Sequence, residues 1–595
     1  MFIRVQSVSR AGRQYRYLKV LASSWQEGRP VQRTVLNFGS VDHWPRERLE
    51  ELVRKLSAFI QLDLVALSAV RLTDCRCLGP YLPLAALWDR LGLDALVAAA
   101  LAGQPLSLPV AAYAKALVLT RLVRPSSKKA LWEALGADTL VPGVDPDALP
   151  LHGYYRALEY LVGAKGTLEK ALHRRLSHLF NRDVSLVFWD LTSTYFEGGG
   201  CPMARHGYSR DHRPDLVQIE IGLLVDGDGI PIAHEVFDGN IKDVATVLPV
   251  LERLQRDFGL RRCIFVGDDG MASAENLQRI AAAGYEYITS LALRRSQAGT
   301  RVVAGLPPRS DFREVSPTLR LGPERVEGVI RYLPTWNPER AASARRHRKE
   351  RLRKCVAELR RLQEPRKPRA RQRTPEQRLA QAAGFLKAKG CAGFFQLRLA
   401  PAAAQACAAG AERLPERVSE RARSLRQEAG AFRLSGRGLS DRPPVGEPGL
   451  HWQLDRQALR SEQRLDGLLV LETNSQELEA AEVAAGYRSL WRVEAAFRGL
   501  KDTIRLRPIR HWTDQRVRGH VFVCVLAFML ERLYDRALEA AGLDLSAQAA
   551  LRQLETIQAV TLEAEGQSLR RRTEITPSQQ RLLAAVQVGQ VPELW

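Results

Sequence analysis

The sequence has few cysteines and no long apolar run. Eight cysteines occur among 595 residues without a regular framework, and Cys75-Arg-Cys77 lacks the two-residue gap and second pair of a zinc knuckle. The longest apolar run, 521–530, is half of what a membrane span requires. The first residues show no charged-then-apolar signal organisation. These absences exclude a disulfide scaffold and a membrane helix, and we expect a cytoplasmic protein.

Acidic residues are outnumbered. The chain has 88 Lys and Arg against 66 Asp and Glu, a formal net charge of +22 and a pI of about 9.9, which favours a polyanionic partner over a small metabolite. Residues 341–380 alone carry 15 Lys and Arg with 4 Glu. Two interpretations of this window stay open, a solvated basic helix and a surface that contacts a phosphate backbone.

The chain is too long for one hydrophobic core, so several domains are expected. Alternating apolar and polar segments near the start predict strands, and 3.6-residue periodicity between 78 and 180 predicts helices. The predicted parts are a small β-rich N-terminal module (1–62), a helical domain for binding DNA ends (63–180), the first part of an α/β core (181–292), a basic insertion (293–463), the last part of the core (464–535) and a helical tail (536–595).

The most regular pattern lies between residues 186 and 291. Strands are predicted at 186–190, 216–225 and 230–237, then a helix at 244–258, a strand at 263–266, a helix at 274–283 and a strand at 285–291. This order, βββαβαβ, is that of ribonuclease-H-like domains, in which the ends of the first and fourth strands lie side by side. We therefore expect an α/β fold with a ribonuclease-H-like core that a large basic insertion interrupts.

Two aspartates follow these neighbouring strands. Asp190 is expected at the end of the first strand and Asp268 at the end of the fourth. Magnesium takes oxygen ligands, and two such ions about 4 Å apart can activate an attacking oxygen and stabilise a departing one during phosphoryl transfer. Either aspartate alone is more often a turn former than a ligand.

A third carboxylate lies on a predicted helix at 477–506. Tyr487, Glu494 and Lys501 are seven residues apart, so a continuous α-helix would place them on one face. That arrangement suits a metal ligand with a phosphate contact on either side. The alternative is a solvated face on which Glu494 pairs with Arg498, four residues later.

Together these motifs resemble the DDE transposases of the insertion-sequence-4 group, and most closely the insertion-sequence-1634-type elements. The resemblance rests on Trp189-Asp-Leu-Thr-Ser-Thr-Tyr-Phe-Glu-Gly198, Val266-Gly-Asp-Asp-Gly-Met271 and the segment from Tyr487 to Lys501, continuing to His511. It implies a catalytic triad of Asp190, Asp268 and Glu494 that holds two Mg²⁺ ions, which Mn²⁺ can replace. Asp268 is preferred to Asp269 because the family pattern is Asp-x-Gly.

The resemblance also implies contacts to DNA. Tyr487 and Lys501 match the Tyr-Arg-Glu-Lys signature of the group, but its arginine position is Leu490 here, which leaves Arg488 and Arg492 as alternative donors. The remaining expected DNA contacts are basic residues on the same segment and in the insertion: Arg498, Arg345, Arg346, Arg348 and Lys349.

Three other groups carry less weight. Ser193 and Thr194 have no nearby His–acid pair that would make either a nucleophile. Trp491 and Trp512 could stack on an unpaired base, although burial in a core is the more common state of tryptophan. A Gly-rich loop with metal-binding residue types matches no zinc spacing, and we interpret it as a surface or DNA-facing loop: Cys201, His206, Asp211 and His212.

The favoured function is that of an insertion-sequence transposase. It would bind terminal inverted repeats of double-stranded DNA, cleave at the element ends and use the freed 3′-hydroxyl to attack target DNA. Bringing two ends together suggests a homodimer in the DNA complex, associated with the nucleoid in the cytoplasm. Two alternatives stay open: a catalytically silent DNA-binding protein derived from a transposase, and a ribonuclease-H-like nuclease without strand transfer.

Overall fold

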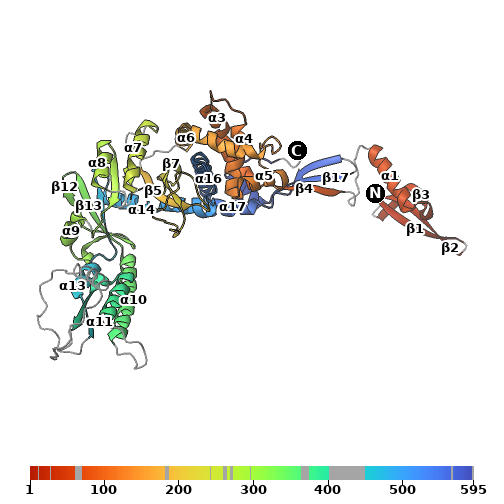
Figure 1. Cartoon of the computed structure of the whole chain (residues 1–595). Helices are drawn as coiled ribbons and strands as arrows, with labels where there is room; N and C mark the ends of the chain where they lie inside the picture. Colours follow the sequence, from red (N-terminus) through yellow and green to blue (C-terminus); the bar gives the residue numbers. More distant parts are fainter. Residues whose placement is uncertain are drawn as a thin grey trace, which may run out of the picture. The chain divides into compact units, whose positions relative to one another are not determined.

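The computed structural model describes residues 1–10, 12–26, 29–59, 70–180, 186–241, 243–258, 264–267, 273–294, 296–363, 374–400, 449–564 and 567–591 (Figure 1). The chain forms two compact units, one made of residues 1–164 with 526–595 and the other of residues 165–525. Among the helices of the described ranges, none combines the length and apolar character needed to cross a membrane.

The first unit begins with a small antiparallel sheet. Strands β1 (Phe2–Arg10), β2 (Arg13–Gln26) and β3 (Arg29–Ser40) pair in the order β1-β2-β3, and helix α1 (Arg46–Phe59) follows. The first turn is tight, since Arg10 pairs with Arg13 across it. A small sheet at the start is what the alternating apolar and polar segments predict.

The rest of the first unit is mainly helical. Its core contains large buried side chains such as Trp88, Tyr113 and Tyr154. The helices are α2 (Tyr81–Leu91), α3 (Leu93–Ala100), α4 (Val110–Val123), α5 (Lys128–Ala137), the first part of α6 (Leu151–Phe180), the last part of α16 (Asp514–Ala540), α17 (Ala547–Leu554) and α18 (Pro577–Ala584).

The prediction of a purely helical tail is wrong. Strands β17 (Gln558–Ala564) and β18 (Gln567–Arg572) form a hairpin there, and β17 also pairs with β4 (Arg71–Cys77). Pairing between segments almost 500 residues apart leaves no local signal, because each short strand is stabilised by a distant neighbour.

The second unit contains a large mixed sheet. Nine of its strands run in the order β10-β11-β13-β16-β9-β8-β5-β6-β7. The predicted succession of three strands, helix, strand, helix and strand is present (Figure 1): β5 (Leu186–Tyr195), β6 (Gln218–Asp226), β7 (Pro231–Asp238), α7 (Val247–Arg256), β8 (Ile264–Val266), α8 (Ala274–Ala282) and β9 (Glu286–Ser290).

The expected insertion, 293–463, is not one body. Its first part extends the large sheet, since β13 pairs with β16, which in turn pairs with β9. The elements of this part are α9 (Gln297–Ala304), β10 (Arg313–Ser316), β11 (Leu319–Leu321), β12 (Arg325–Glu327) and β13 (Ile330–Trp336), with β16 (Leu468–Thr473) completing the pairing.

Its second part has a separate hydrophobic cluster that includes Cys355, Leu359, Leu386 and Phe395. The elements around this cluster are α10 (Pro338–Gln363), α11 (Pro375–Ala388), β14 (Phe395–Ala400) and β15 (Gly449–Leu454), followed by α13 (Arg456–Gln463). Helix α10 and the start of α11 lie in the basic window of the sequence, residues 341–380.

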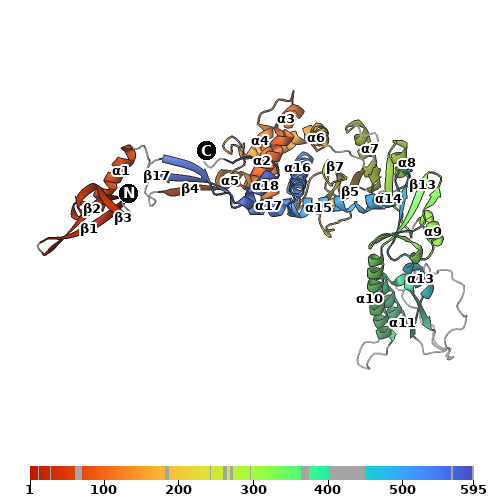
Figure 2. The ribbon, with the colours of Figure 1, turned by 180° about the vertical axis from the view of Figure 1, so that it is seen from behind.

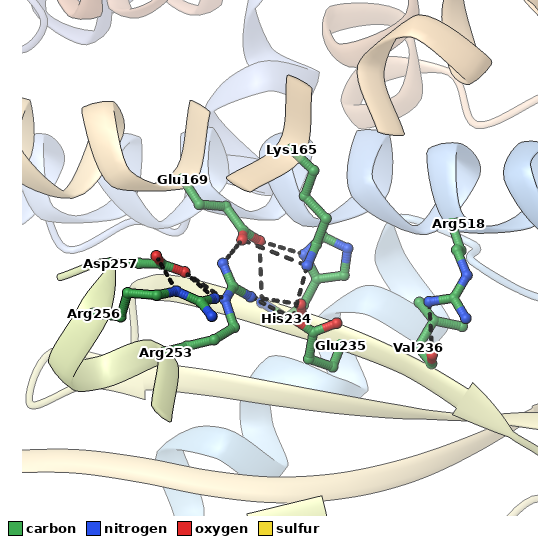
Figure 3. Close-up of polar contacts among 9 residues, drawn as sticks. All are labelled: Lys165, Glu169, His234, Glu235, Val236, Arg253, Arg256, Asp257 and Arg518. Carbon is green, nitrogen blue, oxygen red and sulfur yellow. Dashed lines mark hydrogen bonds and ion pairs between the residues drawn. The ribbon is translucent and has the colours of Figure 1, made fainter. Parts of the chain in front are cut away.

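A buried ion network joins α6, β7 and α7 (Figure 3). Glu169 Oε1 lies 2.8 Å from His234 Nδ1, and Glu169 Oε2 accepts a hydrogen bond from Arg253 at 2.6 Å. Glu235 pairs with Lys165 at 3.1 Å and with Arg253. Burial would raise the pKa of Glu169, but Lys165, His234 and Arg253 together lower it to about 2. The network therefore fixes a helix of the second unit against the edge strand of the sheet.

Candidate active site

Asp190 lies in the middle of β5, so the expectation that it ends the strand is wrong. The strand continues because its residues keep their antiparallel pairing with β6 as far as Tyr195. Asp190 is half-buried, and its Oδ1 accepts a hydrogen bond from the backbone N–H of Leu191 at 2.7 Å.

The side chain of Asp190 projects from one particular face of the sheet. Val187, Trp189 and Leu191 belong to a core cluster with residues of α7 and α8. Side chains alternate along a strand, so Asp190 projects from the opposite face.

Asp268 lies outside the described residues, and so does Asp269. The strand before them, β8, runs parallel to β5 and pairs Val266 with Phe188. In the sequence, Asp190 and Asp268 each follow these paired residues by two positions. The location of the Asp268 side chain stays a prediction.

Glu494 is exposed on the short helix α15 (Trp491–Arg498), which packs on β5 and β6 (Figure 2). The buried residues of α15, which are Val493, Ala496 and Phe497, take no part in the cluster with α7 and α8. The helix therefore covers the face from which Asp190 projects. Glu494 and Arg498 are both exposed, as the alternative of a solvated face expects, but the structure shows no ion pair between their described side chains.

The prediction of one continuous helix around Glu494 is wrong. Tyr487 is in α14 (Ala480–Arg488), Glu494 is in α15, and Lys501 is in a π-helical turn, Gly499–Thr503. Seven-residue spacing therefore does not put the three side chains on a common face.

The helix geometry changes at two points. Arg492 and Val493 donate backbone hydrogen bonds to the carbonyls three residues earlier, at 3.0 and 3.2 Å, which tightens the chain after α14. Ile504 donates to Gly499, five residues earlier, at 3.0 Å, which widens the turn. Tight and wide turns rotate the chain by different angles per residue than an α-helix does, so periodicity counted on the sequence fails here.

Lys501 is buried in an ion pair. Its ammonium donates to Asp211 Oδ1 at 2.7 Å, and the Arg507 guanidinium donates to the same oxygen. The exposed fraction of the side chain is 10% for Lys501 and 3% for Asp211. Burial lowers the pKa of Lys501 from its ordinary value, and the neighbouring Asp211 only partly opposes this shift.

The loop that contains Asp211 is less exposed than the sequence predicts. His206 and His212 are exposed, but Cys201 is buried and the Asp211 carboxylate points into the protein. Within the described ranges, no group of three or more His, Cys, Asp or Glu side chains could hold a metal ion. Sequence reasoning missed the contact between Asp211 and Lys501, since 290 residues separate them.

The expected DNA-contacting residues differ in their surroundings. Arg488 donates a hydrogen bond to Thr318 Oγ1 at 2.9 Å, and Arg492 lies 3.9 Å from Asp228. The side chain of Arg498 is exposed.

On α10, Arg345, Arg346 and Lys349 are exposed. Arg348 is different, because its side chain is buried and its guanidinium binds both carboxylate oxygens of Asp466. The expectation that Arg348 contacts DNA is corrected accordingly, since its guanidinium is buried against Asp466; Arg345 Nε lies 3.7 Å from the same carboxylate, but its side chain stays exposed.

Both tryptophans near the candidate site are exposed. The exposed fraction is 56% for Trp491, at the start of α15, and 72% for Trp512. Packing in a core was the more common state expected for tryptophan, and it does not apply to either residue. Apolar character alone could not reveal this, because exposure depends on which neighbours the fold supplies.

A family model matches the part of the chain that carries these motifs. Comparison with curated proteins finds no match. A solved structure, the cryo-EM structure of piggyBac transposase synaptic complex with hairpin DNA, is similar over 83% of this chain and 81% of that chain, with 9% identity and a TM-score of 0.36. The family model described as the transposase DDE domain matches residues 186–530, more than half of the chain. The protein therefore belongs to the transposase DDE domain family.

Proposed function

We propose that this protein is an insertion-sequence transposase of the insertion-sequence-4 group, most similar to the insertion-sequence-1634 type. It binds the terminal inverted repeats of its element as a homodimer, cleaves the strand at each end and transfers the 3′-hydroxyl to target DNA. In this proposal its place is the nucleoid in the cytoplasm. The family match supports the transposase class, and the arrangement of β5, β8 and α15 supports the residue roles.

One observation carries the proposal. Parallel pairing of Phe188 with Val266 puts β5, which contains Asp190, beside β8, which Asp268 follows by two residues, and α15 with Glu494 packs on the face from which Asp190 projects. A ribonuclease-H-like core with a DDE triad needs this convergence. The strand order β7-β6-β5-β8-β9 also suits such a core.

The proposed triad has the chemistry that Mg²⁺ prefers. All three side chains are carboxylates, Asp190 is half-buried at a sheet face, and Glu494 is open to solvent and to a phosphate. Two Mg²⁺ ions, or Mn²⁺ in their place, would be held by Asp190, Asp268 and Glu494. When bound, such ions lower the pKa of the attacking oxygen and stabilise the departing one.

The chain's own cations would orient the DNA. The side chains of Arg345, Arg346 and Lys349 are exposed on one helix, as contact with a phosphate backbone requires, and Arg345 also lies 3.7 Å from Asp466. Arg488, Arg492, Arg498 and Tyr487 lie along the segment that carries Glu494, where they would contact phosphates near the scissile bond.

Three substitutions test the triad. We expect Asp190→Ala, Asp268→Ala and Glu494→Ala each to abolish Mg²⁺-dependent cleavage of an oligonucleotide duplex that carries the flanking inverted repeat. Binding to the same duplex in EDTA should stay close to wild type. Glu275→Gln, which changes an exposed carboxylate on α8, is the control and should cleave normally. Loss of binding in all three alanine variants would contradict these roles.

The same assay separates the alternatives. A wild-type protein that binds the duplex without cleaving it would be the catalytically silent DNA-binding protein. Cleavage without joining to a target duplex would indicate a nuclease.

Neutralising Arg345, Arg346 and Lys349 together to Gln tests the basic helix. If each contacts one phosphate, the slope of log K against log salt should fall by about 3. An unchanged slope would exclude α10 from the DNA interface.

A further inference from the structure

The loop between β5 and β6 forms a bridge between these two strands and the segment that follows Glu494. Two consecutive residues of this loop, Arg210 and Asp211, contact different parts of the protein: Arg210 contacts the strands, and Asp211 contacts the segment after Glu494. The backbone N–H of Arg210 donates to Ser193 Oγ at 2.8 Å, and its guanidinium donates to Glu220 at 2.7 Å. Ser193 is three residues beyond Asp190 on β5, and it pairs in register with Glu220 on β6. This side of the bridge is therefore attached to the strands that carry Asp190.

Asp211 makes the other side of the bridge. Its Oδ1 accepts hydrogen bonds from Lys501 and Arg507, both of which follow the helix that carries Glu494. Arg507 also donates to Asp502 at 3.1 Å. Among the described residues, Asp211 Oδ2 is buried and has no hydrogen-bond partner. One carboxylate thus attaches the end of the Glu494 segment to the loop of β5 and β6.

The backbone is strained on both sides of this ion pair. His212, next to Asp211, has a φ of 56°, and Arg505, between the two cations, has a φ of 51°. Non-glycine residues seldom adopt this region, and such conformations persist only where surrounding contacts hold them. Surrounding contacts therefore hold the backbone in an unfavourable conformation on both sides of this ion pair.

We infer that Asp211 is a positioning residue that fixes Lys501 and Arg507, and through them sets the place of Glu494 relative to Asp190. This inference rests on the proposed function. Asp211 need not touch DNA or metal itself, because its side chain is almost fully covered by the two cations and the loop. Lys501, which the family signature assigns to a phosphate, is in this protein held by a carboxylate of its own chain.

Asp211→Asn in the full-length protein tests the inference, since it keeps the shape of the side chain and removes its charge. We expect cleavage of the inverted-repeat duplex to slow by about 10-fold to 100-fold, and the half-saturating Mg²⁺ concentration to rise by about tenfold, as for other groups that orient metal ligands indirectly. Duplex binding in EDTA should change less than about threefold, because Lys501 and Arg507 are covered. Asp211→Glu should recover part of the rate.

Asp215→Asn is the matched control. Asp215 lies in the same loop, is exposed and binds Arg213 through both oxygens, and among the described residues it has no hydrogen bond or ion pair with the Glu494 segment. Its cleavage rate and Mg²⁺ dependence should stay within about twofold of wild type. Thermal unfolding of all variants shows whether the proteins are folded.

A second comparison distinguishes loss of this contact from loss of folding. The double variant of Asp211→Asn with Lys501→Met should cleave at about the rate of Asp211→Asn alone, because Asp211→Asn already weakens the contacts to both Lys501 and Arg507 and the two effects do not multiply. Three results would each overturn the inference. Asp211→Asn could cleave at the wild-type rate with the wild-type Mg²⁺ dependence, the losses of cleavage rate could multiply in the double variant, or Asp211→Asn could bind the duplex more tightly in EDTA and cleave it normally. An inactive wild-type protein would overturn the proposed function along with it.

Discussion

The buried ion network around Glu169 makes a sharp prediction about stability. Glu169→Gln removes the carboxylate that faces Lys165, His234 and Arg253. Its pKa of about 2, against 4.5 in an unfolded chain, corresponds to about 3 kcal/mol in favour of folding at neutral pH. Removing one partner of a buried ion pair costs about 3–5 kcal/mol in general. The lower figure applies here, because Lys165 and Arg253 keep Glu235.

Differential scanning calorimetry would measure this loss. For a unit as large as residues 165–525, an unfolding entropy of about 2 cal/mol/K per residue converts 3 kcal/mol into a fall of roughly 4 °C in Tm. Glu275→Gln is the control, since Glu275 pairs with Arg279 on the surface at positions i and i+4, where a pair contributes a few tenths of a kcal/mol.

The pH dependence of the difference in Tm between wild type and Glu169→Gln provides a second test. Glu169 has a lowered pKa in the folded state, so its contribution is complete above pH 4.5 and disappears as the pH falls towards 2. Burial, followed by Lys165, lowers the pKa of His234 below 6.5, so its protonation also opposes folding in acid. The difference in Tm between wild type and Glu169→Gln should therefore shrink below pH 4.5. A difference below 1 °C at pH 7, or one that stays constant down to pH 3, would refute the reasoning.

Three further predictions concern other parts of the chain. Gly222→Ala places a Cβ 2.1 Å from Trp189 Cη2, so Tm should fall by the equivalent of about 1–3 kcal/mol, and an unchanged Tm would show that the packing differs. Trp512→Ala should weaken binding to DNA with unpaired bases by about 1 kcal/mol or more but leave binding to paired duplex unchanged, whereas equal losses on both would argue against stacking. Burial and Asp535 raise the pKa of Glu531 to about 7, so its ionisation opposes folding as the pH rises above 4.5. Glu531→Gln should therefore stabilise the protein by up to about 3 kcal/mol at pH 8 and have little effect at pH 4.5, as denaturant titration at both pH values would reveal.

The sequence determined the elements that local patterns encode. Alternation and periodicity located β5 to β9 with α7 and α8 to within a few residues, the largest difference being the end of β5. The resemblance of the motifs around Asp190, Asp268 and Glu494 to DDE transposases also indicated the family, because such motifs are encoded by residue type and order.

Tertiary structure alone decided the surroundings of the side chains. The break between α14 and α15, the burial of Arg348 against Asp466 and the exposure of Trp512 left no trace in residue spacing. The contact between Asp211 and Lys501 depends on how a loop and a π-helical turn meet. A sequence pattern determines whether a segment forms a helix or a strand, because that preference is local. Burial and ion pairing are instead set by neighbours that can lie hundreds of residues away in the sequence.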